Sequence, residues 1–321
     1  MTHSRRPLTV VQVKLRHREA GVALVIALVV VAIAVTTLVP GAVRERVAVA
    51  HTANVIDRLQ ARALAHGVLT WASGVLDTDG DGDSVDFLGE PWATPVPGLA
   101  AGRGVASGAL VDLRSRLNLN ALIDERGLVN GLQLARVQRL LALLKLDASV
   151  AGAIVDWVDA DDVEQLGGGA ESAYYLQLEP AYRSANQPFA SVSELRLVAG
   201  MNDANFVVLA PFVSALDDDM TINVNTATLN VLLALGDNLQ ASLLEDFVQR
   251  RVASPARGFA DIRAEQGFSD GLESLRGLNI ISDDFLLRAR IQLPRAVLDV
   301  RCRLRRSRTG TKAQRCWEVI D

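Results

Sequence analysis

Histidine is scarce in this chain of 321 residues. The 4 histidines all lie early, and the last three-quarters of the chain contain none: they are His3, His17, His51 and His66. Catalytic triads that use histidine, and zinc sites with histidine ligands, are therefore excluded from most of the chain. This absence gives no support to an enzymatic function, and we expect none.

Cysteine is also rare, with only Cys302 and Cys316 near the end of the chain. In an oxidising compartment these two residues can form a disulfide between neighbouring strands. The sequence does not fix the distance between their Cα atoms, so a pair of free thiols remains the alternative.

Charge is absent from Val22 to Val39, where Thr36 and Thr37 are the only polar residues. A helix of this length reaches roughly 27 Å at about 1.5 Å per residue, which is enough to cross the core of a bilayer. The apolar part of a secretory signal is shorter, about 7–15 residues. The run therefore predicts a membrane span.

The charges beside this span predict its orientation. Before it lie five basic residues against Glu19, whereas the far side offers Arg44 and Arg46 against Glu45. The positive-inside rule places the leader in the cytoplasm and everything after Pro40 outside. The five basic residues are Arg5, Arg6, Lys14, Arg16 and Arg18.

The whole chain is acidic, with 33 basic and 37 acidic side chains, and the part after the leader is more acidic still. Such a surface repels nucleic acid and acidic lipid. Basic residues nevertheless gather near the C-terminus, where we interpret them as the solvated face of a hairpin. They are Arg301, Arg303, Arg305, Arg306, Arg308, Lys312 and Arg315.

Hydrophobic spacing predicts an α+β fold. Leu64, Val68 and Trp71 recur at helical spacing, so the span is expected to continue as one amphipathic helix to about Leu76. A loop-rich stretch follows, and alternating residues from Leu110 and at the chain end predict strands around a helical middle. A long helix packed on a small antiparallel sheet with a helical insertion fits this order.

The helical middle contains a degenerate repeat. "LNLNA" at 117–121 resembles "INVNTA" at 222–227, and each is followed by leucine-rich sequence. A Phe-Ala pair then follows in both, at 189–190 and at 259–260. Two related helical units are the simplest interpretation.

These motifs together resemble a known family. Gly21 followed by Val22 and an apolar helix looks like the processing site of type IV prepilins, and "LNLNAL", "DWVDADD" and "INVNTAT" resemble the protein K family of type II secretion, the large minor pseudopilins. The resemblance implies a pilin-like fold with two inserted all-α, SAM-like units. It also implies a single-pass inner-membrane protein at the tip of a periplasmic pseudopilus, with the minor pseudopilins I and J as partners.

The resemblance implies that the chain divides into six segments. The first three are a cytoplasmic leader over 1–21, the long transmembrane and periplasmic helix over 22–76, and a loop with the first strands over 77–118. The other three are the first SAM-like unit over 119–216, the second over 217–285, and the last strands over 286–321.

The resemblance implies that prepilin peptidase cuts after Gly21, so that Val22 becomes the first residue of the mature protein. Ordinary secretory signals place the small residue behind the apolar run instead. Most pilins have glutamate at the fifth mature position, and here that position is Ile26. A permanently anchored protein with an uncut leader is the alternative.

The first candidate metal site is "DTDGDGDSVDFL", in which Asp77, Asp79 and Asp81 occupy positions one, three and five of a calcium loop. Position twelve is Leu88 instead of the bidentate glutamate, which excludes a complete EF-hand. A weak calcium site and a solvated acidic loop are both consistent with this pattern.

A second acidic cluster lies further along the chain. Asp156 and Asp159 are one helical turn apart, and the three glycines at 167–169 allow the chain to bring Glu171 back toward them. The resemblance implies calcium here, and a solvated helix end is the alternative. The candidate ligands are Asp156, Asp159, Asp161, Asp162 and Glu171.

A membrane-anchored DNA-uptake protein is the competing hypothesis, because "INVNTATLNVLLAL" followed by "FADI" resembles helix-hairpin-helix repeats. The matching turns, 235–239 and 198–203, are acidic and lack clustered lysine or arginine. Phosphate binding would therefore lack its main electrostatic contribution. We interpret both turns as parts of protein-interaction modules, and we expect the stripe of Leu64, Val68 and Trp71 to dock on the partner pseudopilins.

Overall fold

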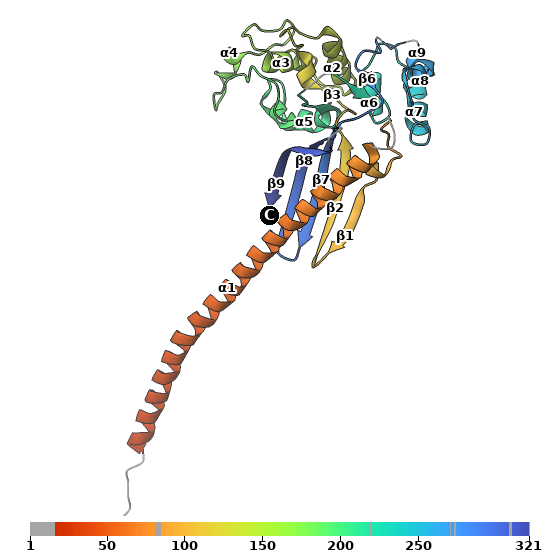
Figure 1. The fold of residues 1–321 in the computed structure, drawn as a ribbon. Coiled ribbons are helices and arrows are strands. Elements are labelled where there is room, and N and C mark those ends of the chain that lie inside the picture. Colours follow the sequence, from red (N-terminus) through yellow and green to blue (C-terminus); the bar gives the residue numbers. More distant parts are fainter. Residues whose placement is uncertain are drawn as a thin grey trace, which may run out of the picture. The chain divides into compact units, whose positions relative to one another are not determined.

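The computed structural model describes residues 17–80, 85–217, 220–269, 271–272, 274–307 and 310–320. These residues form one long helix, a five-stranded sheet and a set of short helices, as Figure 1 shows. The chain divides into two compact units, one up to Leu59 and one from Gln60 onward, which are described separately below.

Helix α1 runs from His17 to Gly80. In the first unit its apolar side chains are exposed, and it is long and apolar enough to cross a membrane. The Thr36 and Thr37 hydroxyls donate to the carbonyls of Ala32 and Ile33, at 2.9 and 2.8 Å, so both polar groups are satisfied within the helix. Apolar surroundings require this, because they offer no water as a hydrogen-bond partner.

The sheet is antiparallel in the order β1-β2-β7-β8-β9. The strands over 284–293 and 296–305 alternate between buried and more exposed residues, as the sequence predicted for this region. The stretch before Gly104, expected to be a loop, contains strand β1. The strands are β1 (Val96–Ala101), β2 (Gly104–Asp112), β7 (Asp284–Leu293), β8 (Ala296–Arg305) and β9 (Lys312–Ile320).

The end of α1 that belongs to the second unit covers one face of this sheet (Figure 1). Its contact face is made of small residues, since Ala61, Ala65 and Ala72 are buried there together with Leu76. Alanine side chains allow a helix to lie close to the strands beneath it. The helix also continues beyond Leu76 to Gly80, so the loop expected from position 77 begins later.

A large helical insertion lies between β2 and β7, which are themselves paired neighbours. Its first part contains β3 (Leu117–Asn118), η2 (Leu119–Leu122), α2 (Gly131–Leu143), α3 (Ser149–Val158), α4 (Ser172–Tyr175), η3 (Val192–Leu197), α5 (Asp203–Leu209), η4 (Ala210–Phe212) and β4 (Val213–Ser214). Its second part contains β5 (Ile222–Asn223), α6 (Leu229–Leu233), α7 (Ala241–Arg250), α8 (Phe259–Ala264), α9 (Gln266–Ser269) and β6 (Leu278–Asn279).

The internal repeat has a structural basis. Each part is closed by a two-residue parallel pair, β3 with β4 and β5 with β6. In both parts an asparagine exchanges two hydrogen bonds with the backbone of a distant residue: Asn120 with Phe189, and Asn225 with Ala256. The counterpart of Phe189 is therefore Ala256, whereas Phe259, which the sequence paired with it, begins α8.

The two parts share one hydrophobic core. Val137 and Leu140 of α2 belong to the same buried cluster as Val231 and Leu232 of α6. The insertion is thus two repeats in sequence but one packed body in space.

The cysteines face each other across the last hairpin. Cys302 on β8 pairs in register with Cys316 on β9, and a disulfide joins them.

Candidate functional site

The second acidic cluster lies where α3 ends and α4 begins. Asp159 follows the last residue of α3, Glu171 directly precedes α4, and Asp161 lies in the loop between them. One carboxylate oxygen of each comes within 4.8 Å of the others. Trp157 packs edge-on against Tyr175, at 5.3 Å between ring centroids, and this contact fixes the two helices around the acids.

Two of these carboxylates are buried and carry oxygens without a hydrogen-bond partner. Asp159 is 4% exposed and Glu171 is 2% exposed. Among the described residues, none donates a hydrogen bond to Asp159 Oδ1 or to either Glu171 oxygen. A buried charge without a partner is costly, and the C-terminus of α3 adds its own negative partial charge. The arrangement therefore fits a bound cation.

The titration of these groups points the same way. Burial, together with the nearby charges of Asp156 and Asp159, raises the pKa of Glu171 to about 7. Burial and the charge of Asp161 raise the pKa of Asp159 to about 6. Without a cation, these two acids would be partly protonated near neutral pH. Oxygen ligands alone suit a hard cation such as Ca²⁺, which completes its shell of 6–8 oxygens with backbone or water oxygens.

Asp156 and Asp162, the other predicted ligands, lie outside this group. The Asp156 carboxylate accepts a hydrogen bond from the backbone N–H of Gln165 at 3.1 Å. A Cβ at Gly169 would come within 2.3 Å of Asp156 Oδ2, so this glycine is needed for the close turn. The Asp162 side chain is exposed and accepts from Asn186 Nδ2 at 3.3 Å. Asp156 therefore shapes the loop that returns Glu171.

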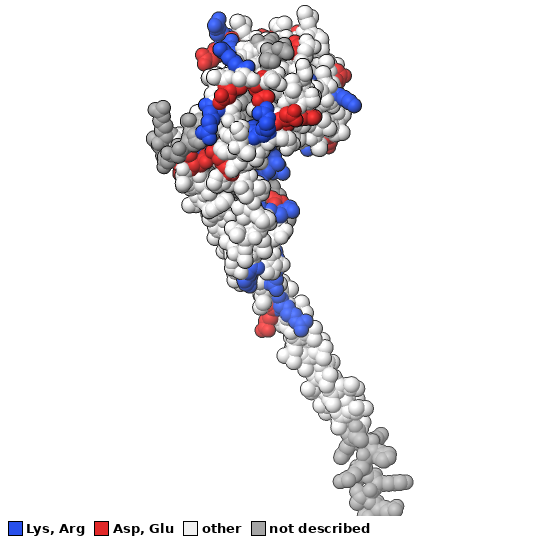
Figure 2. Space-filling model, turned by 90° about the vertical axis from the view of Figure 1, so that its right-hand side faces the viewer, with Lys and Arg blue, Asp and Glu red and all other residues white. Residues whose placement is uncertain are grey.

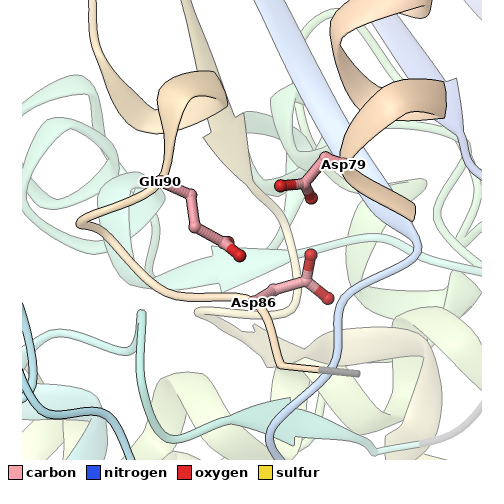
Figure 3. Close-up of side chains that lie close together, drawn as sticks. All are labelled: Asp79, Asp86 and Glu90. Atoms are coloured by element: carbon pink, nitrogen blue, oxygen red, sulfur yellow. The ribbon is translucent and has the colours of Figure 1, made fainter. Parts of the chain in front are cut away.

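A different acidic cluster forms around the first candidate site. Figure 3 shows Asp79 at the end of α1 and Asp86 and Glu90 on the segment that follows, with their carboxylates turned toward one another. This grouping differs from the sequence pattern. Asp77 and Asp79 belong to the last turn of α1 and not to a loop, and Asp81 lies outside the described residues.

The oxygens of this cluster already have donors. Arg306 donates to Asp79 at 2.7 Å and to Asp86, and Glu90 accepts from the backbone N–H of Phe87 and the indole of Trp92 at 2.9 and 2.7 Å. Asp77 accepts from the backbone N–H of Thr311 at 2.6 Å. The guanidinium of Arg306 supplies the positive charge here. We therefore interpret this cluster as a structural contact that holds the end of α1 to the last hairpin.

The stripe of Leu64, Val68 and Trp71 is partly covered by the chain itself. Leu64 and Val68 are half-buried against the sheet core, whereas Trp71 is 49% exposed. The covered face of α1 is the alanine face, which a search for large hydrophobic residues misses. Trp71 is therefore the member of the stripe that remains available to a partner.

Gly21 and Val22 lie near the start of α1 and are exposed, as is Ile26. Nothing within 4 Å would obstruct a side chain at Gly21, so packing in the structure does not require a glycine there.

The turns that resemble phosphate-binding hairpins carry paired acids. Asp237 forms two hydrogen bonds with Arg139, at 2.7 and 2.9 Å, and Asp203 pairs with Arg196. Figure 2 shows basic and acidic side chains interspersed on the face that it draws. Nothing in these observations supports the DNA-binding alternative.

Comparisons with known proteins agree with this fold. Two family models described as "Type II secretion system (T2SS), protein K" match residues 115–218 and 222–277. Type II secretion system protein K of Pseudomonas aeruginosa is 35% identical over 272 residues, which cover 81% of this chain and 79% of that protein. Its counterpart of Klebsiella pneumoniae is 35% identical over 224 residues, covering 66% of this chain and 68% of that protein.

A solved structure has the same fold. The crystal structure of the GspK-GspI-GspJ complex from the type 2 secretion system of enterotoxigenic Escherichia coli contains a chain that matches with a TM-score of 0.73 and 24% identity. The match covers 84% of this chain and 99% of that one. Sequence and fold agree, and the chain belongs to the type II secretion system protein K family.

Proposed function

We propose that this protein is a minor pseudopilin at the periplasmic tip of the type II secretion pseudopilus, where it helps to start pseudopilus assembly. The observation that carries this proposal is the helical body inserted between β2 and β7 of a sheet covered by α1. A body of this size fits poorly into a subunit that repeats along a tightly wound shaft. It fits a subunit that occurs once, at an end.

The membrane anchor and the missing carboxylate support this position. Helix α1 can hold the protein in the inner membrane with the residues after Pro40 in the periplasm, as the charges beside the span indicate. Ile26 stands where most pilins carry a glutamate, and a carboxylate in lipid is costly unless it is paired. A subunit at the tip has no neighbouring subunit above it, so such a carboxylate would have no partner there.

The partners that we propose are the minor pseudopilins I and J. The matched chain of the solved structure belongs to a complex whose other named members are GspI and GspJ. On this chain, the exposed Trp71 offers a large apolar side chain on α1, and aromatic residues often anchor protein interfaces.

Trp71→Glu is expected to break the complex with I and J. Burying a charge in place of an aromatic anchor costs about 2–4 kcal/mol, which weakens binding by roughly 30-fold or more. Co-purification from membranes measures the loss. Thr70→Glu is the matched control, since Thr70 is exposed beside it and its hydroxyl donates to the carbonyl of His66 in the same helix. Val68 is unsuitable, because it packs on the sheet core. Full retention of both partners by Trp71→Glu would refute this docking site.

Processing is expected between Gly21 and Val22, by prepilin peptidase. Intact-mass analysis of protein from its native membrane should find the leader missing and Val22 at the N-terminus. Gly21→Leu should retain the leader, because the structure leaves room for the side chain and only the peptidase would reject it. Assembled protein that still begins with Met1 would contradict this expectation.

We also propose that Asp159, Asp161 and Glu171 hold a calcium ion. The buried oxygens without hydrogen-bond partners support this, and the ion would fasten the loop between α3 and α4. Its role would be structural, because no histidine follows His66 in the sequence to serve either acidic cluster as a general base.

A further inference from the structure

A groove of about 620 Å³ lies between the outer face of the sheet and the first part of the insertion. Strands β7 and β8 form one side, and η3 with α5 forms the other; Figure 1 places α5 beside the end of β8. This face of the sheet is opposite to the one covered by α1, because its residues alternate with the buried ones. A volume of this size suits a ligand of several residues.

Four arginines line this groove, and three of them, Arg116, Arg288 and Arg301, are arranged unfavourably in the free protein. Arg288 and Arg301 are direct partners in the register of β7 and β8, where like charges destabilise a sheet. Burial and the charge of Arg288 lower the pKa of Arg116 to about 10, against an opposing effect of Asp112. Burial and the charge of Arg301 lower the pKa of Arg288.

The acids near the groove are occupied by other arginines. Asp299 is held by Arg290 through two hydrogen bonds of 2.7 Å, and Arg303 is paired with both Asp284 and Asp217. Within the described part of the chain, Arg116, Arg288 and Arg301 form no ion pair. Arg116 donates only a long hydrogen bond of 3.4 Å, to the carbonyl of Ala210.

The rest of the lining is largely apolar. Leu286 comes from β7, Val192 from η3 and Phe206 from α5. A small inorganic anion would leave these side chains without a contact. Nucleic acid is disfavoured by the net negative charge of the chain. A ligand that fits both features carries carboxylates among apolar side chains.

We propose that this groove binds an acidic, partly apolar peptide segment of a partner protein, with Arg116, Arg288 and Arg301 contacting its carboxylates. Guanidinium groups bind carboxylates through paired hydrogen bonds, and the bound segment would relieve the repulsion between Arg288 and Arg301. The groove is distinct from the Trp71 surface of α1, so the proposal does not depend on docking to I and J.

The test uses the full chain in nanodiscs of phosphatidylcholine, which carries no net charge. Its probes are fluorescent peptides of about seven residues in which Asp or Glu alternates with Leu, Phe or Ser, each beside a copy with Asn or Gln in place of the acids. Fluorescence anisotropy should find peptides whose acidic form binds at least about tenfold more tightly, with an affinity that falls as salt is added. Equal binding of the acidic and amide forms throughout would overturn the proposal.

Variants locate the binding site. The double variant Arg288→Gln and Arg301→Gln should weaken the acidic peptides about tenfold or more, because two charge-assisted contacts are lost. Arg295→Gln removes a charge from the exposed turn of the same hairpin, outside the groove, and should leave the affinity unchanged. An equal loss in both variants would mean a nonspecific charge effect. Displacement of the peptide by millimolar inorganic phosphate would mean a simple anion site, and either result would refute the proposal.

A stability measurement separates binding from a structural role. If Arg288 and Arg301 serve a ligand, Arg301→Gln should keep or raise the melting temperature of the free protein, by up to about 1–3 °C, because a repulsive pair is removed. A clear fall in melting temperature would indicate that Arg301 supports the fold instead and would contradict the inference.

Discussion

Removing calcium is expected to lower the melting temperature of this protein by roughly 5–10 °C. A ligand that binds only the folded state stabilises it by RT ln(1 + [L]/Kd), about 2.7 kcal/mol at a hundredfold excess over Kd. For a protein of this size each kcal/mol shifts the melting temperature by about 2–4 °C. The physical source is the set of buried carboxylate oxygens on Asp159 and Glu171, which have no other partner. Thermal unfolding in millimolar calcium and in chelator measures the difference.

Matched variants assign the response to this cluster. Asp159→Asn combined with Glu171→Gln should abolish the effect of calcium while raising the melting temperature in chelator, because two buried acids no longer need to stay neutral. Asp162→Asn is the control, since it removes an acid from the same loop but outside the group. An identical melting temperature with and without chelator would show that no ion binds here. A loss of the response in Asp162→Asn alone would place the ion elsewhere.

The helix and the sheet could be predicted because hydrophobic residues recur in each element with the period of that secondary structure. Alternation from Leu287 to Leu293 marks β7, and the uncharged run after Gly21 marks the span. The contact face of α1 could not be predicted in this way. It consists of Ala61, Ala65 and Ala72, and small residues give little signal in a count of large hydrophobic ones.

The candidate metal site could be predicted as a segment but not as a set of ligands. The spacing of Asp156, Asp159 and Asp161 is compatible with several geometries. Only the folded loop reveals that the backbone N–H of Gln165 donates to the Asp156 carboxylate, whereas among the described residues the Glu171 carboxylate has no hydrogen-bond donor. The sequence did not predict the contacts of Arg306 for another reason. Arg306 is separated from its partners Asp79 and Asp86 by more than two hundred residues of sequence. No local pattern reports such a contact.

The junction between the sheet and the second part of the insertion depends on one buried acid, Asp112 at the end of β2. Its Oδ2 accepts from the hydroxyls of Ser282, at 2.6 Å, and Thr226, and its Oδ1 accepts from the backbone N–H of Arg114 at 2.7 Å. Asp112 is 3% exposed. It therefore connects three segments that are far apart in the sequence.

Asp112→Ala is expected to cost about 3–5 kcal/mol of folding free energy, because it takes the acceptor from the Ser282 hydroxyl and the Arg114 N–H, leaves the Thr226 hydroxyl only the carbonyl of Asn223 at 3.3 Å, and opens a cavity. The melting temperature should fall by roughly 10 °C. Thr226→Val is the matched control: it removes one donor and keeps the acid, so a cost of about 1–2 kcal/mol is expected. Denaturant unfolding of the full-length protein measures both. A cost below that of Thr226→Val would show that Asp112 does not hold the junction.

The pH dependence of Asp112→Asn isolates the charge from the shape. Burial raises the pKa of Asp112 to about 6, above its ordinary value of 3.8. A raised pKa means that the folded state favours the protonated acid, so its contribution to stability is complete below about pH 4 and is lost as the pH rises through about 6. Asparagine does not titrate. Between pH 4 and pH 8 the free energy of unfolding of the variant should therefore rise by about 3 kcal/mol relative to that of the native protein. Parallel stability profiles for the two proteins over this range would refute the assignment, because a solvated or fully compensated carboxylate would contribute no such difference.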